Sequence, residues 1–290
     1  RWSAKTKKEM RKRSEIDPDK FASLVVDDEP KYEHNYKSEY RGRVQNRQVE
    51  TSYLPMFQLS YFPNTQNVSG VQAFDKAVED LNQQLSTLAS GPSASGSKAA
   101  AAKGKTSDKV YIVCSKEQLD ENGSMKIFSL IDKLSAELSV AKDIEQKKLI
   151  LMRRAIAHSV LRDFEAAISD FTYYISLDDK NALAYWQRAV CQTEMDEFNK
   201  AEGKGVVNIH SAEADFSDAI RLNSSNAYIY YNRGNLHAGR NELSKAIDDY
   251  TIALKIDNRL AEAYYNRGIA RAKSGNRQAG IQDLSKAGEL

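Results

Sequence analysis

The tract 99–106 (AAAAKGKT) is the stretch of this sequence whose residue types most suggest nucleotide chemistry. It matches a permissive phosphate-loop pattern that ends in Gly104-Lys105-Thr106, with alanine in place of the first glycine. A phosphate loop needs a buried strand before it and a helix after it, so that backbone N–H groups surround the phosphate. Here a Ser/Gly-rich tract precedes the motif and a strand pattern follows it. Nucleotide binding is therefore the least favoured function.

The remaining candidates for catalysis or metal binding are scattered along the chain. The histidines are not spaced with Cys, Asp or Glu as metal ligands are, and two of them fall on an equivalent packing position (His34, His158, His210 and His237, of which His158 and His237 are the pair). Cys114 and Cys191 lie far apart, without a CxxC motif, and no GxSxG or catalytic Cys–His signature is present. We therefore expect no catalytic residues, no metal and no cofactor, and hence a protein that is not an enzyme.

Composition indicates a folded chain with balanced charge. Apolar residues make up 41% of the 290 residues, and 42 Lys and Arg face 40 Asp and Glu. This balance argues against a dedicated nucleic-acid binder. The sequence contains no run of about 18 apolar residues, so it predicts no transmembrane segment. The chain starts at Arg1 without a signal segment, so we expect a fragment or a processed product.

The amino-terminal half predicts a small β-containing region between linkers. Residues 1–38 combine a basic helix pattern over 1–14 with a polar linker. Residues 39–121 form the β-containing module, with a polar strand pattern over 40–51, strands at 56–62 and 109–114 that could pair, and a helix over 71–88. The tract 90–108 is rich in Ser, Gly, Ala and Lys and is predicted to be flexible.

A helix within 122–147 is predicted to close the array that follows. Asn122-Gly123 predicts a turn, and Ser124 predicts the helix cap. Apolar residues then recur at helical spacing and predict one packing face, namely Met125, Phe128, Ile131, Leu134 and Leu138. We expect this face to cover the first repeat.

Residues 148–290 repeat with a period of thirty-four residues. Tyr231-Asn232-Arg233-Gly234 matches Tyr265-Asn266-Arg267-Gly268 at that spacing. This is the length of one helix-turn-helix unit in a helical solenoid. The units are 148–181, 182–226, 227–260 and 261–290, and the second carries an insertion at 199–211.

Within each unit, numbered from its first residue, particular positions hold particular residue types. Position 4 is large, positions 8 and 20 are small, and position 24 is large and mostly aromatic, as in Tyr230, Gly234, Ala246 and Tyr250. Small residues at 8 and 20 let two helix backbones approach closely. Arginine recurs at position 7 and aspartate at position 23, which predicts a ladder of ion pairs (Arg154, Arg188, Arg233 and Arg267 with Asp170, Asp215, Asp249 and Asp283).

These residues resemble the tetratricopeptide repeat (TPR) family. The resemblance covers residues 148–290, although the family's proline at position 32 is absent. It implies a mostly α fold, a TPR-type α-solenoid of helix-turn-helix repeats preceded by a small β-containing segment and linkers. It also implies a concave groove lined by the first helix of each unit. Carried over to this sequence, that groove contains Met152, Arg153, Trp186, Gln187, Tyr231, Asn232, Asn235, Tyr265 and Asn266.

Aromatic and amide side chains on one surface suit an extended peptide or a partner helix, because Asn can hold a backbone amide at both ends. The alternative is that Tyr231 and Tyr265 pack between units while the asparagines bond neighbouring helices. We expect a protein or peptide ligand, no nucleic acid and a place in a multi-protein assembly. The primary hypothesis is a non-enzymatic scaffold or adaptor that binds its partner in the groove.

A shorter resemblance concerns the amino-terminal half. Residues 41–47 (RGRVQNR) and 54–57 (LPMF) are similar to a segment of large multi-repeat proteins of Gram-negative bacteria. That similarity implies a periplasmic or outer-membrane-associated protein, with a cytoplasmic location as the alternative. It also implies the alternative function, a structural subunit of a cell-envelope complex in which the β-containing segment is the main contact.

Overall fold

The fold is known from a computed structural model, which describes residues 52–62, 75–90, 109–114, 119–203 and 209–290. All of these except Ser52 belong to one compact unit, Tyr53–Leu290. The predictions for 1–38 and 40–51, most of the tract 90–108 and Gly104-Lys105-Thr106 lie outside the described residues. The same holds for part of the insertion at 199–211.

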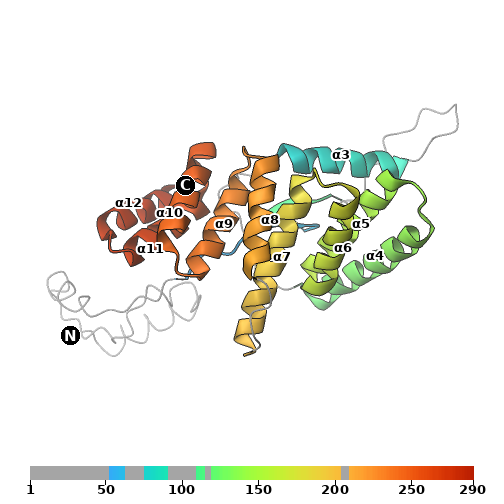
Figure 1. The fold of residues 1–290 in the computed structure, drawn as a ribbon, viewed down its shortest axis with the longest axis horizontal. Helices are drawn as coiled ribbons and strands as arrows, with labels where there is room; N and C mark the ends of the chain where they lie inside the picture. The colour runs from blue at the N-terminus through green and yellow to red at the C-terminus, as the bar shows by residue number, and fades with distance from the viewer. Residues whose placement is uncertain (1–51, 63–74, 91–108, 115–118, 204–208) are drawn as a thin grey trace, which may run out of the picture. The chain divides into compact units, whose positions relative to one another are not determined.

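Four helix pairs follow one another along the carboxy-terminal half, as Figure 1 shows. They are α5 and α6 (Ile144–Val160, Phe164–Leu177), α7 and α8 (Ala182–Ala201, Ile209–Leu222), α9 and α10 (Ala227–Gly239, Leu243–Ile256), and α11 and α12 (Ala261–Lys273, Arg277–Glu289). Each pair packs against the next. The predicted TPR-type α-solenoid is confirmed, and α5 starts a turn earlier than Lys148.

The first helix of a pair ends at an equivalent position in three of the four units. Position 15 adopts a left-handed backbone in Arg162, Asn241 and Gly275, with φ values of 63°, 61° and 97°. Such a residue stops a helix and turns the chain toward its partner. In the second unit α7 continues through this position, and Gly203 (φ 69°) follows its end. Residues 199–201 of the predicted insertion therefore belong to α7, and α8 already begins at Ile209, before the predicted insertion ends.

The small residues at positions 8 and 20 lie at the contact between the two helices of a unit, as predicted. A Cβ on Gly234 would lie 2.7 Å from Cε1 of Tyr250, the large residue at position 24 of the same unit. Gly268 meets Leu284 and the carbonyl oxygen of Gly280 at similarly short distances. These glycines let the two helices of a unit touch, which is the packing predicted from positions 8 and 20.

The arginine ladder is confirmed in every unit. Each guanidinium donates two hydrogen bonds of 2.6–2.9 Å to the aspartate at position 23 of its own unit. In three units it also bonds a hydroxyl on the preceding helix, at Ser135, Thr172 and Thr251. The ladder thus ties neighbouring elements together as well as the two helices of one unit.

Helix α4 (Glu121–Val140) packs against α5 and supplies Ser135 to this ladder. The prediction of its packing face was partly wrong. Ile127 and Leu134 are buried, whereas Met125 and Phe128 are 66% and 56% exposed. Asp120, not Ser124, caps the helix by accepting a hydrogen bond from the N–H of Gly123, so the predicted turn is the first helical turn.

The β-containing module consists of two strands and a helix. Strands β1 (Phe57–Ser60) and β2 (Tyr111–Cys114) pair antiparallel, with Phe57 opposite Cys114. The predicted pairing is therefore confirmed. Helix α3 (Lys76–Ser90) is capped by Asp75 and buries Val78, Leu81 and Leu85. The side chains of β1 and α3 belong to the same apolar core as the repeats.

Candidate binding groove

The first helices of the units, α5, α7, α9 and α11, line a groove that strand β1 enters. β1 contacts α5, α7 and α9, and Leu54, three residues before the strand, bonds α11. Position 6 of each unit lies along this strand segment, through the side chain in the last three units and through the main chain in the first. It holds Arg153, Gln187, Asn232 and Asn266, all of which the sequence placed in the groove.

Side-chain amides at position 6 hold the main chain of the strand. Asn232 accepts from the N–H of Phe57 (2.8 Å) and donates to its carbonyl oxygen (2.7 Å). Asn266 does the same for Leu54, at 2.8 and 3.1 Å. Gln187 accepts from the N–H of Leu59 at 3.0 Å. We call these three residues, Gln187, Asn232 and Asn266, the amide ladder.

The strand runs opposite to the order of the repeats. Leu54 meets the fourth unit, Phe57 the third and Leu59 the second. At the first unit, the hydroxyl of Tyr61 donates to the carbonyl oxygen of Arg153 at 2.7 Å. One stretch of extended chain therefore contacts every unit of the array.

A second layer of polar groups holds the start of the strand. The Tyr231 hydroxyl donates to the Pro55 carbonyl oxygen (3.0 Å), and Asn235 donates to that of Leu54 (2.9 Å). Asn235 also accepts from Asn266 and from the Tyr250 hydroxyl, at 2.9 and 2.7 Å. These groups are therefore held by hydrogen bonds to one another as well as by the main chain of the strand segment.

The side chains of the strand fill the apolar floor of the groove. The ring of Phe57 packs against those of Tyr228 and Tyr231, with centroids 4.7 and 5.1 Å away. Phe57, Leu59 and Tyr61 are no more than 4% exposed. Burial also raises the pKa of Tyr231 well above its ordinary value, and that of Cys191 to about 12. Both groups are therefore neutral near pH 7.

The other predicted groove residues differ in their surroundings. Met152 and Trp186 are fully buried, and Trp186 stacks on Tyr228. Tyr265 is half-buried. The indole N–H of Trp186 and the amide N–H₂ of Gln187 have no hydrogen-bond partner among the described residues. Tyr231 packs against Tyr250 and also donates a hydrogen bond to the main chain of the strand segment of the same chain.

Sequence reasoning did not predict that the groove holds a segment of the same chain. The spacing in sequence between partners is large, 175 residues between Phe57 and Asn232 and 212 between Leu54 and Asn266. The available signal was the strand pattern of 56–62, which was separately predicted to be half-buried. Binding of an outside partner by these residues stays a prediction.

The far side of the two-stranded sheet is held in a similar way. On α3, Asn82 accepts from the N–H of Val110 (2.8 Å) and donates to its carbonyl oxygen (2.9 Å). Asn226, the last residue of the second unit and the N-cap of α9, donates to Asp75 at the start of α3 (2.8 Å). The module is thus tied to the repeats through main-chain and side-chain hydrogen bonds at several points.

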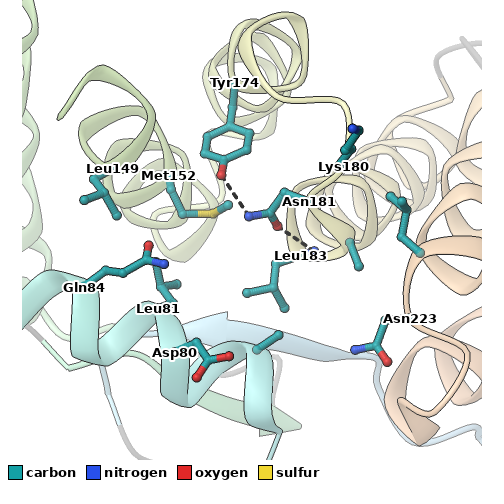
Figure 2. Close-up of a pocket in the computed structure, with 13 residues that line it drawn as sticks. Asp80, Leu81, Gln84, Leu149, Met152, Tyr174, Lys180, Asn181, Leu183 and Asn223 are labelled. Carbon is teal, nitrogen blue, oxygen red and sulfur yellow. Dashed lines mark hydrogen bonds between the residues drawn. The ribbon is translucent and has the colours of Figure 1, made fainter. Parts of the chain in front are cut away.

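A second concavity lies between α3 and the first two units (Figure 2). Its volume is about 310 Å³. Leu81, Met152 and Leu183 form apolar walls, and exposed Asp80 and Lys180 lie at its edge. The Asn181 amide is already used, since it donates to the Tyr174 hydroxyl and caps α7. This pocket shows no polar group that waits for a ligand.

The described residues show no arrangement for metal chemistry. Across these ranges, no group of His, Cys, Asp and Glu residues could hold a metal ion. His158 bonds Asp163 at 3.0 Å and His237 bonds Glu242 at 2.8 Å, each within one unit. His34 and the side chain of His210 lie outside the described residues. No helix in the described part of the chain is long and apolar enough to cross a membrane.

Comparison with known proteins agrees with this architecture. A family model described as a TPR repeat matches residues 239–275. The crystal structure of MamA is similar over 60% of this chain and 95% of its own, with a TM-score of 0.49 and 21% identity. The structure of YrrB, described as a TPR protein with an unusual peptide-binding site, is similar over 57% of this chain and 81% of the YrrB chain, with a TM-score of 0.43 and 17% identity. No match was found among curated proteins.

The period, the helix pairs and the small-residue contacts define a TPR solenoid. Solenoids in general form extended concave surfaces.

Proposed function

We propose that this protein is a non-enzymatic interaction scaffold whose groove binds an extended polypeptide through its main chain. The observation that supports this is the amide ladder, in which Gln187, Asn232 and Asn266 each take a main-chain N–H of the strand. Contacts to main chain give affinity, and the aromatic floor gives a preference for apolar side chains.

An extended partner fits this groove better than a helix does. A helix uses its own N–H and C=O groups internally, so that Asn232 and Asn266 would be left without partners. Both side chains are completely buried. Leaving buried amides unsatisfied costs about 1–3 kcal/mol per group. A partner helix, the other occupant considered from the sequence, is therefore the poorer match.

The resident strand competes with any outside partner. It is covalently attached, and a tethered ligand acts at an effective concentration in the millimolar range. An outside peptide therefore binds strongly only when the resident strand is weakened. This gives the proposal a direct experiment.

The experiment uses a fluorescent peptide with the sequence of Tyr53–Phe62 and the full chain carrying Phe57→Ala. We expect this variant to bind the peptide at least tenfold more tightly than the wild type, measured by fluorescence anisotropy. Adding Asn232→Leu should abolish the gain, whereas Asn258→Ala, in an exposed loop, should not. If circular dichroism shows that the Phe57→Ala variant is folded and it still binds no peptide, the proposal is wrong.

A second candidate function follows from the same occupancy. Because the β-containing module fills the groove, a partner could instead contact the module, as in a structural subunit of a larger envelope complex. The resemblance of residues 41–47 and 54–57 to multi-repeat proteins of Gram-negative bacteria supports a periplasmic or outer-membrane-associated place for such a subunit. Partners retained by a chain with Asn232→Leu and Asn266→Leu would favour this function over the first.

A further inference from the structure

We propose that the strand Leu54–Tyr61 of a second copy of this chain occupies the groove in place of the resident strand, so that two copies are joined by exchange. This inference rests on the proposed function and names the partner. The strand is bound as a separate ligand would be. Its contacts to the repeats are hydrogen bonds and side-chain packing to residues more than 90 positions away in sequence.

The groove and the strand match in register. The N–H groups held by Gln187 and Asn232 are two positions apart in the sequence, and those held by Asn232 and Asn266 are three positions apart. Extended chain rises about 3.3 Å per residue, so these steps span roughly 7 and 10 Å. The longer side chain, Gln187, serves the shorter step. Its additional methylene group lets a regularly spaced repeat reach Leu59.

Proline in the strand fits the same register. Pro55 has no N–H, so it could not satisfy an amide in the groove. The ladder skips it and takes Leu54 instead, while the Pro55 carbonyl oxygen accepts from the Tyr231 hydroxyl. Counted from Leu54, an occupant must therefore present N–H groups at its first, fourth and sixth positions. It must also present apolar side chains, which become buried, at its fourth, sixth and eighth positions. The chain's own segment satisfies every one of these requirements.

Energetics favour a second copy over an unrelated strand. A foreign strand replaces the resident contacts but leaves the released segment exposing Met56, Phe57 and Leu59, which are at most 6% exposed in the fold. When two identical copies exchange strands, both grooves are filled and every one of these contacts is formed again. The free energy of association then depends mainly on concentration and on the linking chain.

The test is photocross-linking between distinguishable full-length copies. One copy carries a mass tag and Tyr53→p-benzoylphenylalanine, and the other is wild type. Tyr53 is half-buried beside α11, and the ammonium group of Lys273 lies 4.5 Å from the centre of its ring. The copies are mixed at high concentration and then illuminated. We expect a cross-linked product of two copies, joined to α11 of the wild-type copy and identified by mass spectrometry.

Two controls accompany this experiment. Moving the photoreactive residue to exposed Gln83 should remove the product that is joined to α11. Asn232→Leu and Asn266→Leu in the receiving copy should lower the yield at least fivefold. Cross-links that stay within one copy at every concentration would overturn the exchange. If they do so while the Tyr53–Phe62 peptide binds the Phe57→Ala variant, the groove function stands and the exchange alone is wrong.

Discussion

At the scale of single residues, Asn232 shows how one side chain can connect a repeat to an extended strand. It is fully buried and forms hydrogen bonds with both the N–H and the carbonyl oxygen of Phe57. A carboxamide offers a donor and an acceptor at the spacing of one peptide unit, which no aliphatic side chain can do. The same geometry recurs at Asn266 and, from α3, at Asn82.

We therefore expect Asn232→Ala to destabilise the protein by roughly 2–4 kcal/mol, because two buried main-chain groups lose their partners at about 1–3 kcal/mol each. Urea denaturation followed by circular dichroism measures this change. Asn258→Ala, at an exposed position, is the matched control and should stay within about 0.5 kcal/mol of wild type. Equal effects of the two substitutions would contradict the role of the ladder.

Much of this site followed from residue types at equivalent positions. Asn232 and Asn266 share one position in units spaced by thirty-four residues, and the resemblance to TPR proteins implied that this position lines the groove. The occupant could not be predicted in the same way, because Phe57 pairs with Asn232 across 175 residues. Periodicity describes local structure and says nothing of which distant segment fills a surface.

At the scale of elements, the crossing of α9 and α10 depends on the absence of one carbon atom. A Cβ at Gly234 would lie 2.7 and 2.9 Å from two ring carbons of Tyr250. Tyr250 is fully buried, and its hydroxyl donates to Asn235, so the ring has little freedom to move. The glycine is therefore required by close helix packing rather than by its backbone conformation.

We expect Gly234→Ala to destabilise the protein by about 1–3 kcal/mol through overpacking, although alanine is the better helix former. Gly239→Ala, at the end of the same helix, is the control, because nothing lies within 4 Å of its added Cβ. That variant should be neutral or more stable by up to about 1 kcal/mol. Thermal melting of both variants measures the contrast, and a stabilised Gly234→Ala variant would show that the crossing tolerates a methyl group.

The packing of α4 shows why an element can be predicted while its orientation is missed. Five apolar residues at helical spacing predicted one face, of which Leu134 is buried as predicted, whereas Met125 and Phe128 are exposed and Ile127 is buried instead. Apolar residues surround much of this helix, so the pattern leaves its rotation open. The rotation is decided by contacts with α5, such as the hydrogen bond between Ser135 and Arg154.

At the scale of the whole molecule, the strand and the repeats behave as interdependent parts. We expect the amide protons of Phe57 and Leu59 to exchange with solvent at one common free energy of opening, because release of the strand breaks both contacts together. Native-state hydrogen exchange by NMR measures this. Asn266→Leu should lower both values by the same amount. Different opening free energies for Phe57 and Leu59 would mean that the strand leaves the groove piecewise.

The strand has a mechanical consequence for the array. Stacked helix pairs can rotate slightly relative to their neighbours, and these small rotations add up to bending and stretching of the whole array. Fully extended backbone cannot lengthen, and here it is fastened to the first unit at Tyr61 and to the last at Leu54. The segment thus joins the first and last units at a fixed length, and we expect the array to bend and stretch more easily without it.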